Sequence, residues 1–201
     1  MYIDKSLKVY LDDLAAKKAA PGGGSASALV GAEGTALLIM AANFTLGKER
    51  YRQYDKEVCS ILAKLEDLRK RFMVQVDGDV EAYTKLAGIF KIKKGAPIDE
   101  DLKEASGVPM DIAKSSLEAL KLGLQLVDKA NPNLISDVGV GNEFLSAAYE
   151  GAKYNIEINL NSMRDREHIS KIRADLGAMD KEVFSLKKAI NDKVKSIMGN
   201  G

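Results

Sequence analysis

Hydrophobic residues recur along much of the chain at intervals of three and four, the spacing that places them on one face of an α-helix. The longest such stripe begins after Asp55, ends at Phe90, and predicts a helix of about ten turns at 3.6 residues per turn. Gly78 interrupts it and marks a bend or a close approach to another element. Shorter stripes predict three more amphipathic helices, over residues 4–17, 99–127 and 165–198.

Local signals add detail to two of these helices. In the helix over residues 99–127, Asp99 is a candidate cap for the first turn, and Pro109 predicts a kink because proline lacks a backbone donor. The apolar face of the N-terminal helix is formed by Leu7, Tyr10, Leu11 and Leu14. We expect this short helix to flank the glycine-rich segment that follows it.

The stretch from Ala20 to Tyr51 has a different pattern, with three glycines, Gly22, Gly23 and Gly24, followed by Ser25 and an almost unbroken apolar run. Ser25 is a good helix N-cap, and the glycines leave a bare backbone that a ligand can approach closely. An anion would be stabilised there by the positive end of the helix dipole. A helix without a polar face is buried, so the sequence predicts a loop that feeds a core helix.

The same apolar run is close to the length that spans a bilayer. Glu33 lies near its middle, where lipid disfavours a carboxylate, and no second clean span is present. We therefore expect no membrane association. A second helix rich in small residues begins near Ser136 and continues past Ile156.

The pattern as a whole predicts an all-α protein, because alternating strands and hairpin turns are missing from the sequence. We expect one domain over residues 1–201, an up-and-down bundle of five or six long helices. Some of these helices are too long for a compact monomer, so a symmetric homodimer is expected.

The amino-acid composition argues against several classes of function. Thirty basic against 29 acidic residues give a net charge of +1, which gives little support to nucleic-acid binding. Cys59 is the only cysteine, which excludes an internal disulfide, and its helical position predicts a packed thiol. The N-terminal residues lack the apolar core of a signal peptide, so a cytoplasmic location is the simplest expectation.

The usual catalytic constellations are mostly missing. Without a cysteine and histidine cluster we expect no metal, and His168 stands alone on a charged helix. The glycine run resembles part of a phosphate loop, but no Gly-Lys-Ser/Thr sequence follows it. Taken alone, it fits packing geometry better than nucleotide binding.

Polar residues at buried helical spacing are more informative. Asp77 and Asp79 flank Gly78, and Asp79 and Tyr83 are four residues apart on one helix face. Asp79 is either solvated through a helix twist or a desolvated acid whose pKa is raised for proton transfer. Amides suited to a heterocycle, or to helix capping, are present at Asn43, Asn131, Asn133, Asn155 and Asn159.

Four segments together resemble the formiminotetrahydrofolate cyclodeaminase family, which also includes methenyltetrahydrofolate cyclohydrolases. They are PGGGSASALVGAEGTALLIMAANFTLGKERY, DGDVEAY, GVPMDIA, and NPNLISDVGVG followed by YNIEINL. The resemblance covers most of the chain in the same order. Two departures are Glu33, where the family usually has an apolar residue, and a short segment between Pro97 and Gly107.

The resemblance implies an all-helical dimer that binds a tetrahydrofolate derivative without a cofactor and uses an acidic residue for proton transfer. Carried onto this chain, Asp79 is the first candidate for the acid and Asp77 the second. Lys48 and Arg50 are candidates for binding the glutamate tail of the folate. Further candidates for the folate pocket are Gly22, Gly23, Gly24, Ser25, Asn43, Tyr83, Asn131, Ser136, Asp137 and Asn159.

The function implied is that of an ammonia-lyase of histidine degradation and one-carbon metabolism, converting 5-formiminotetrahydrofolate to 5,10-methenyltetrahydrofolate with release of ammonia. One alternative is a methenyltetrahydrofolate cyclohydrolase, in which water opens the same ring. The other is a non-enzymatic helical assembly module in which Asp79 is merely solvated. The residues do not separate the two reactions, because one acid serves both.

Overall fold

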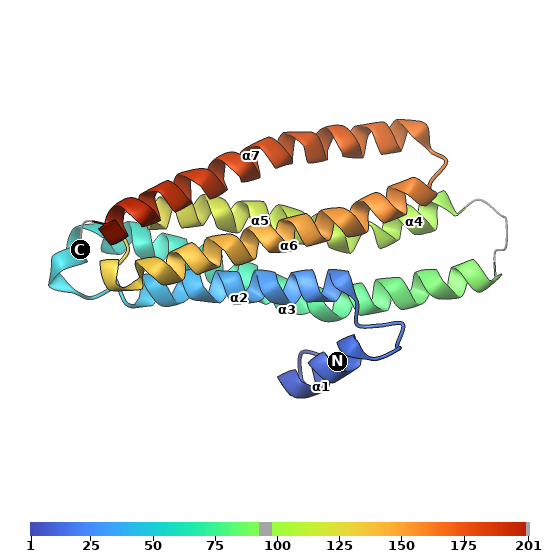
Figure 1. Cartoon of the computed structure of the whole chain (residues 1–201), viewed down its shortest axis with the longest axis horizontal. Helices are drawn as coiled ribbons and strands as arrows, with labels where there is room; N and C mark the ends of the chain where they lie inside the picture. Colours follow the sequence, from blue (N-terminus) through green and yellow to red (C-terminus); the bar gives the residue numbers. More distant parts are fainter. Residues whose placement is uncertain (93–97, 200–201) are drawn as a thin grey trace.

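Seven α-helices and two 3₁₀ turns make up the described part of the chain, residues 1–92 and 98–199 of a computed structural model (Figure 1). Residues 93–97 and 200–201 lie outside it. In chain order the elements are α1 (Leu7–Ala15), α2 (Gly23–Asn43), η1 (Glu49–Tyr54), α3 (Asp55–Ile92), α4 (Asp99–Ala105), α5 (Gly107–Leu126), η2 (Pro132–Leu134), α6 (Ile135–Ser162) and α7 (Arg166–Gly199).

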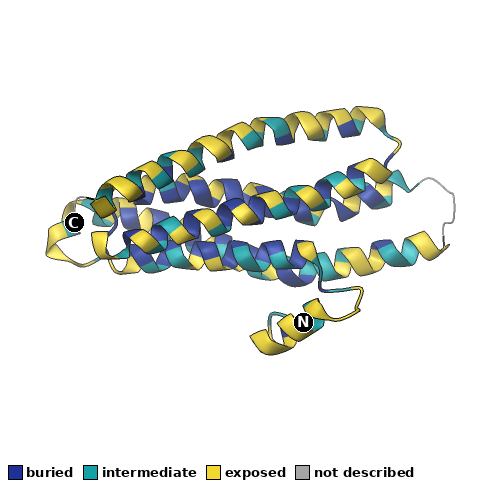
Figure 2. Cartoon of the chain, in the orientation of Figure 1, coloured by how far each residue is buried: buried dark blue, intermediate teal, exposed yellow. Residues whose placement is uncertain are grey.

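The five long helices run back and forth along one direction, as expected for an up-and-down bundle (Figure 1). Helix α2 packs against α3 on one side and α6 on the other, and α7 covers α5 and α6. No strand occurs in residues 1–92 or 98–199, so the predicted all-α fold is confirmed. The buried apolar residues form a single cluster that reaches from Tyr10 to Val194 (Figure 2).

Small residues let α2 sit at the centre of the bundle. A Cβ on Gly31 would lie 2.5 Å from the Phe72 ring of α3, and one on Gly34 would lie 3.0 Å from the backbone oxygen of Gly141 on α6. Only glycine permits this closeness, and tight packing of this kind gives interiors their high density. The prediction of a buried core helix after the glycine run is therefore confirmed.

By length and composition, α2 is the one helix in the described residues that could cross a membrane. Within its most apolar window, 61% of the residues are buried inside the protein. Core helices of soluble bundles are apolar for the same reason, and α2 has neighbours on two sides.

The helix predicted over residues 99–127 is broken at Ser106 into α4 and α5. Pro109 produces no kink, because it lies in the first turn of α5, where backbone N–H groups have no acceptor within the helix. Asp99 does not cap α4, whose cap position is Ile98. Its carboxylate instead accepts hydrogen bonds from the backbone N–H groups of Arg164 and Asp165, just before α7.

Helix α1 spans Leu7–Ala15 and flanks the glycine-rich segment through Tyr10, as expected, while Leu7 and Leu11 of its apolar face are exposed. One expectation about exposure was wrong. Cys59 is exposed rather than packed, because its neighbours Val58 and Ile61 occupy the buried side of α3.

Candidate active site

Asp79 on α3 faces the N-terminal end of α2. Its Oδ2 atom accepts a hydrogen bond of 2.8 Å from the backbone N–H of Ser25. A Cβ on Gly24 would lie 2.0 Å from the Oδ1 atom of Asp79, so only glycine at this position leaves room for the carboxyl group. The position where an anion was expected is thus occupied by the carboxyl group of Asp79, which accepts from a first-turn N–H group of α2.

The three glycines and the serine have different roles. Gly22 is the N-cap of α2, so Ser25 is not the cap but a buried residue of the first turn. The Oγ atom of Ser25 is 3.1 Å from the hydroxyl of Tyr10 on α1. Cβ atoms on Gly22 or Gly23 would meet no close contact, the nearest being the Asn155 side chain at 3.6 Å from Gly23. Only Gly24 is therefore required by the position of Asp79.

Burial raises the pKa of Asp79 above that of an ordinary aspartate, and the hydrogen bond from the Ser25 amide partly opposes the shift. The charged form is disfavoured because the residue is partly buried and no cation pairs with its carboxyl group among the described residues. The desolvated alternative for Asp79 therefore agrees with the structure better than the solvated one. An acid of this kind retains its proton at a pH where a surface aspartate has lost it.

Asp79 lies in the wall of a cavity of about 260 Å³ between α3, α4, α5 and α6. Two other predicted site residues, Tyr83 and Asn159, line the same cavity, together with Asn155. The apolar part of the wall includes Leu86, Phe90, Leu102, Pro109 and Ile158. The structure thus brings one acid, two amides and a phenol into one space.

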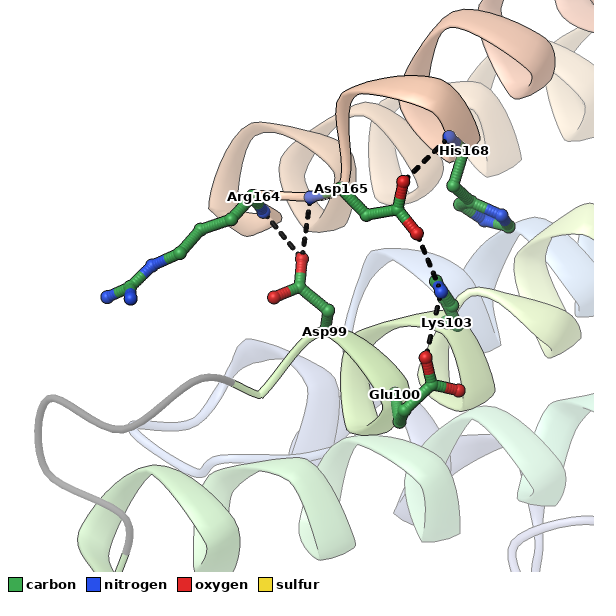
Figure 3. A network of polar contacts seen from close by, with 6 residues as sticks. All are labelled: Asp99, Glu100, Lys103, Arg164, Asp165 and His168. Atoms are coloured by element: carbon green, nitrogen blue, oxygen red, sulfur yellow. Dashed lines mark hydrogen bonds and ion pairs between the residues drawn. The ribbon is translucent and has the colours of Figure 1, made fainter.

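Helix α4, which forms part of the cavity wall, is held by an ionic network (Figure 3). The network consists of Asp99, Glu100, Lys103, Arg164, Asp165 and His168. Lys103 pairs with Asp165 at 2.9 Å and with Glu100 at 2.8 Å, and these carboxylates raise the pKa of its ammonium group. Because Leu102 and Ala105 of α4 line the cavity, the network ties the wall to the connection between α6 and α7.

The second candidate acid, Asp77, has a different environment although it is only two residues away. Its carboxylate accepts hydrogen bonds from the backbone N–H groups of Tyr2 and Ile3, and the residue is 5% exposed. It does not line the cavity that contains Asp79. Asp77 therefore anchors the N-terminal segment to α3.

The remaining predicted site residues lie around the other end of α2, about 30 Å from Asp79 at 1.5 Å per residue of this 21-residue helix. They are Asn43, Lys48, Arg50, Asn131, Ser136 and Asp137. Asn131 is 5% exposed, and its side-chain amide donates to the Phe44 carbonyl and accepts from Asn133 and Tyr51. Within one chain these residues do not reach the Asp79 cavity.

Two features help to delimit the site. In the described residues, no group of three His, Cys, Asp or Glu side chains is placed to hold a metal ion. Larger surface grooves of about 650 and 470 Å³ run between α3 and α5 but contain none of the predicted site residues. The cavity at Asp79 is therefore the best candidate for the active site.

A family model described as formiminotransferase-cyclodeaminase matches residues 6–178. The chain belongs to this family. The methenyltetrahydrofolate cyclohydrolase of Methylorubrum extorquens is 31% identical over 96% of this chain and 97% of its own length. The formimidoyltransferase-cyclodeaminase of Rattus norvegicus is 28% identical over 90% of this chain, which spans only 35% of that relative.

The fold is also that of a solved structure, the formiminotetrahydrofolate cyclodeaminase of Thermotoga maritima. It superposes with a TM-score of 0.92 at 28% identity, covering 98% of this chain and all of the other. The family predicted from the four sequence segments is confirmed. The relatives' names agree with the prediction of a folate enzyme, and they include both of the reactions considered above.

Sequence reasoning missed part of the site. Asn155 was noted as an amide but not assigned to the pocket, although its four-residue spacing from Asn159 places both on one helix face. The position of the N-terminal helix beside the glycine-rich segment was predicted, but the specific contact between Tyr10 and Ser25 was not.

Proposed function

We propose that this chain is a formiminotetrahydrofolate cyclodeaminase. The observation that carries the proposal is the Asp79 carboxyl group, with a pKa raised by burial, in a cavity wall that also presents two amides. The similarity to a cyclodeaminase along the whole chain supports the same conclusion. Because ammonia leaves, such an enzyme is an ammonia-lyase, and we place its activity in histidine degradation in the cytoplasm.

In this reaction N10 of the folate attacks the formimino carbon carried on N5. A bond forms between that carbon and N10, and the bond from the carbon to its amino nitrogen breaks. The formimino group reacts in its protonated form, so its nitrogen already carries two protons. N10 loses one proton and the departing nitrogen gains one before it leaves as ammonia. Nucleophile and electrophile belong to one molecule, so the enzyme needs to fold the substrate and move protons.

Asp79 is suited to both proton transfers. In its neutral form it protonates the departing nitrogen, and the resulting carboxylate accepts the proton of N10. Asn155 and Asn159 offer donors and acceptors for the edge of the pterin. Tyr83 and Phe90 are about half exposed at the cavity and provide flat apolar surfaces for its rings.

The test is to incubate the protein with 5-formiminotetrahydrofolate and, separately, with 5,10-methenyltetrahydrofolate, while following methenyl absorbance and ammonia. The proposal expects absorbance to rise with the first substrate, with one ammonia released for each methenyl group formed. No change with either substrate would favour a non-enzymatic helical module. A fall with the second substrate and no reaction of the first would identify a cyclohydrolase.

The cyclohydrolase remains the second candidate because the Methylorubrum extorquens relative with that name matches along nearly its whole length. In that reaction water attacks the methenyl carbon, and the bond to one ring nitrogen breaks to leave a formyl folate. Asp79 would then take one proton from water and return it to the released nitrogen, while the second proton of water leaves to solvent as the formyl carbonyl forms. The two reactions therefore use the same acid.

The size of the cavity suggests that one chain does not form the whole site. Ligand pockets for molecules of drug size are about 300–1,000 Å³, whereas this cavity is about 260 Å³. We therefore include a homodimer in the proposal, with the second copy covering part of the folate.

An exposed apolar face of α6 fits such a partner. Its exposed residues are Val140, Ala147, Tyr154 and Ile158, spaced by seven, seven and four. This spacing is that of a helix seam that packs on another helix. Tyr154 is 77% and Ile158 63% exposed, and Ile158 also lines the cavity, so the apolar face and the candidate site are continuous.

Val140→Asp tests the dimer away from the cavity. We expect this variant to become a monomer in sedimentation analysis and to lose turnover, because a carboxylate would be buried in the interface. Phe184→Asp is the matched control, since Phe184 on α7 is 72% exposed and lies outside the seam. A wild-type protein that is monomeric and fully active would contradict the dimer.

A further inference from the structure

The N-terminal arm, residues 1–15, lies beside the bundle and leads into the N-terminal end of α2 (Figure 1). Its first contact is made by Asp77, which accepts hydrogen bonds from the backbone N–H groups of Tyr2 and Ile3. The Tyr2 ring packs edge to face on Tyr10 at 5.6 Å between centroids, with the Lys5 ammonium 4.3 Å from the Tyr2 ring. The arm thus has its own small aromatic cluster.

The second contact leads to the active site. Tyr10 is 4% exposed, and its hydroxyl is 3.1 Å from the Oγ atom of Ser25. The backbone N–H of that same Ser25 donates to Asp79. The chain of contacts therefore runs from the arm, through Ser25, to the carboxyl group proposed to move protons.

The arm contributes no residue to the cavity, so it does not touch the space where substrate would bind. Of the arm's apolar residues in α1, Leu7 and Leu11 are exposed, whereas Tyr10 is buried beside Ser25 in the first turn of α2. The titratable groups near Asp79 are Tyr10 from α1 and Asp77 and Tyr83 from α3, while α2 and α6 present the uncharged Ser25, Asn155 and Asn159.

We propose that the N-terminal arm is a positioning element of the active site: Asp77 holds the arm in place, and Tyr10 closes the outer side of the Ser25–Asp79 contact against water. Two aspartates separated by one residue then have separate roles, one for anchoring and one for proton transfer. The inference rests on the proposed function only for its kinetic consequence. The attachment of the arm and its effect on the pKa of Asp79 can be measured without substrate.

Two variants release the arm by different means. Asp77→Asn retains the shape of the side chain but replaces one acceptor oxygen by a donor, which opposes a backbone N–H group. Tyr10→Ala removes the ring that fills the space beside Ser25. These variants change the local charge differently, so an effect that both share arises from release of the arm.

We expect hydrogen exchange at residues 2–10 to become faster in both variants, while the bundle helices stay protected. The pKa of Asp79, followed by carbon NMR of labelled aspartate and assigned with Asp79→Asn, is expected to fall as water reaches the carboxyl group. On a folate substrate, kcat/KM is expected to drop by roughly 10- to 100-fold through kcat, the scale of a displaced catalytic group, with KM little changed.

The controls distinguish this role from general destabilisation. Tyr10→Phe keeps the ring and is expected to retain most of the Asp79 shift, and Asp12→Asn changes an exposed carboxyl of the arm without effect. A released arm with an unchanged Asp79 pKa would overturn the proposal, as would an arm that stays protected in Asp77→Asn. Absence of turnover in the wild type would refute the proposed function and leave the NMR result to decide this inference.

Discussion

The two ends of α2 are both closed by polar side chains from other segments, but in different ways. At the C-terminal end, Asn131 uses both its amide nitrogen and its amide oxygen in hydrogen bonds to surrounding groups. At the N-terminal end, Asp79 receives a single backbone hydrogen bond and has no cationic partner in the described structure. The polar side chain at the C-terminal end is hydrogen-bonded through both of its polar atoms, whereas the one at the N-terminal end is an incompletely solvated acid.

The two helix ends differ in the energetic cost of the polar group that closes them. A neutral amide caps a helix end without a charge to desolvate, so Asn131 is a good structural choice. A buried carboxyl group disfavours its own ionisation, and such groups cluster at functional sites. The comparison therefore separates the polar residues of this chain into those that hold the bundle together and one that is suited to chemistry.

The largest expected effect is that of Asp79→Asn. The side chain keeps its shape and still accepts the Ser25 N–H, but it no longer transfers a proton. We expect turnover to fall by about 10²- to 10⁴-fold, the range for loss of a general acid or base, while folate binding by titration calorimetry is retained. Near-normal ammonia release by this variant would exclude the proposed role.

The glycine run provides the next test. Gly24→Ala places a Cβ where the Asp79 carboxyl group lies, so the carboxyl must rotate away from Ser25. We expect kcat to decrease by roughly 10²-fold, as for other small misplacements of a reacting group, with a nearly unchanged melting temperature. Gly23→Ala is the matched control, because its Cβ makes only an ordinary contact with Asn155. Equal activities of the two variants would show that Asp79 does not need its observed position.

At the C-terminal end of α2, we expect a substitution to change the stability of the fold rather than turnover. Asn131→Ala removes the cap of η2 and the bond to the Phe44 carbonyl, and is expected to cost about 1 kcal/mol in urea unfolding. Asn133→Ala serves as control because Asn133 contributes its backbone N–H, which alanine retains. A large loss of turnover in a stably folded Asn131→Ala protein would instead assign this residue to the site.

The smallest effect concerns the pH dependence of stability. Burial raises the pKa of Asp79 in the folded state, so the folded protein holds this proton more tightly than the unfolded chain does. As pH rises from below the unfolded pKa through the folded pKa, wild-type stability is expected to decrease relative to Asp79→Asn. Denaturant unfolding at a series of pH values measures this difference, and a constant difference would show that Asp79 is solvated.

Much of this fold could be predicted from the sequence because it depends on local sequence patterns. The buried α2 follows from an apolar run with small residues, and the length of α3 follows from its stripe. The cavity residues Asp79 and Tyr83 share a helix face by spacing alone. These features depend on neighbours within a few turns.

Other features depend on contacts between distant segments, and they were not predicted. Asp99 was expected to cap its own helix but binds the N–H groups before α7, 65 residues away. Asp77 and Asp79 have the same local pattern, and only the packing of the N-terminal arm and of α2 distinguishes them. The family motifs alone did not show that their residues divide between the two ends of α2.

The central claim is that a carboxyl group with a raised pKa transfers the protons of the reaction. Its most direct test is the pH profile of kcat/KM for the wild type and for Asp79→Asn on the same folate substrate. We expect the wild-type profile to show an ionisation at a pH above the ordinary range of aspartate. We expect the profile of the variant's residual activity to lack this ionisation. Profiles of the same shape for both proteins would contradict it.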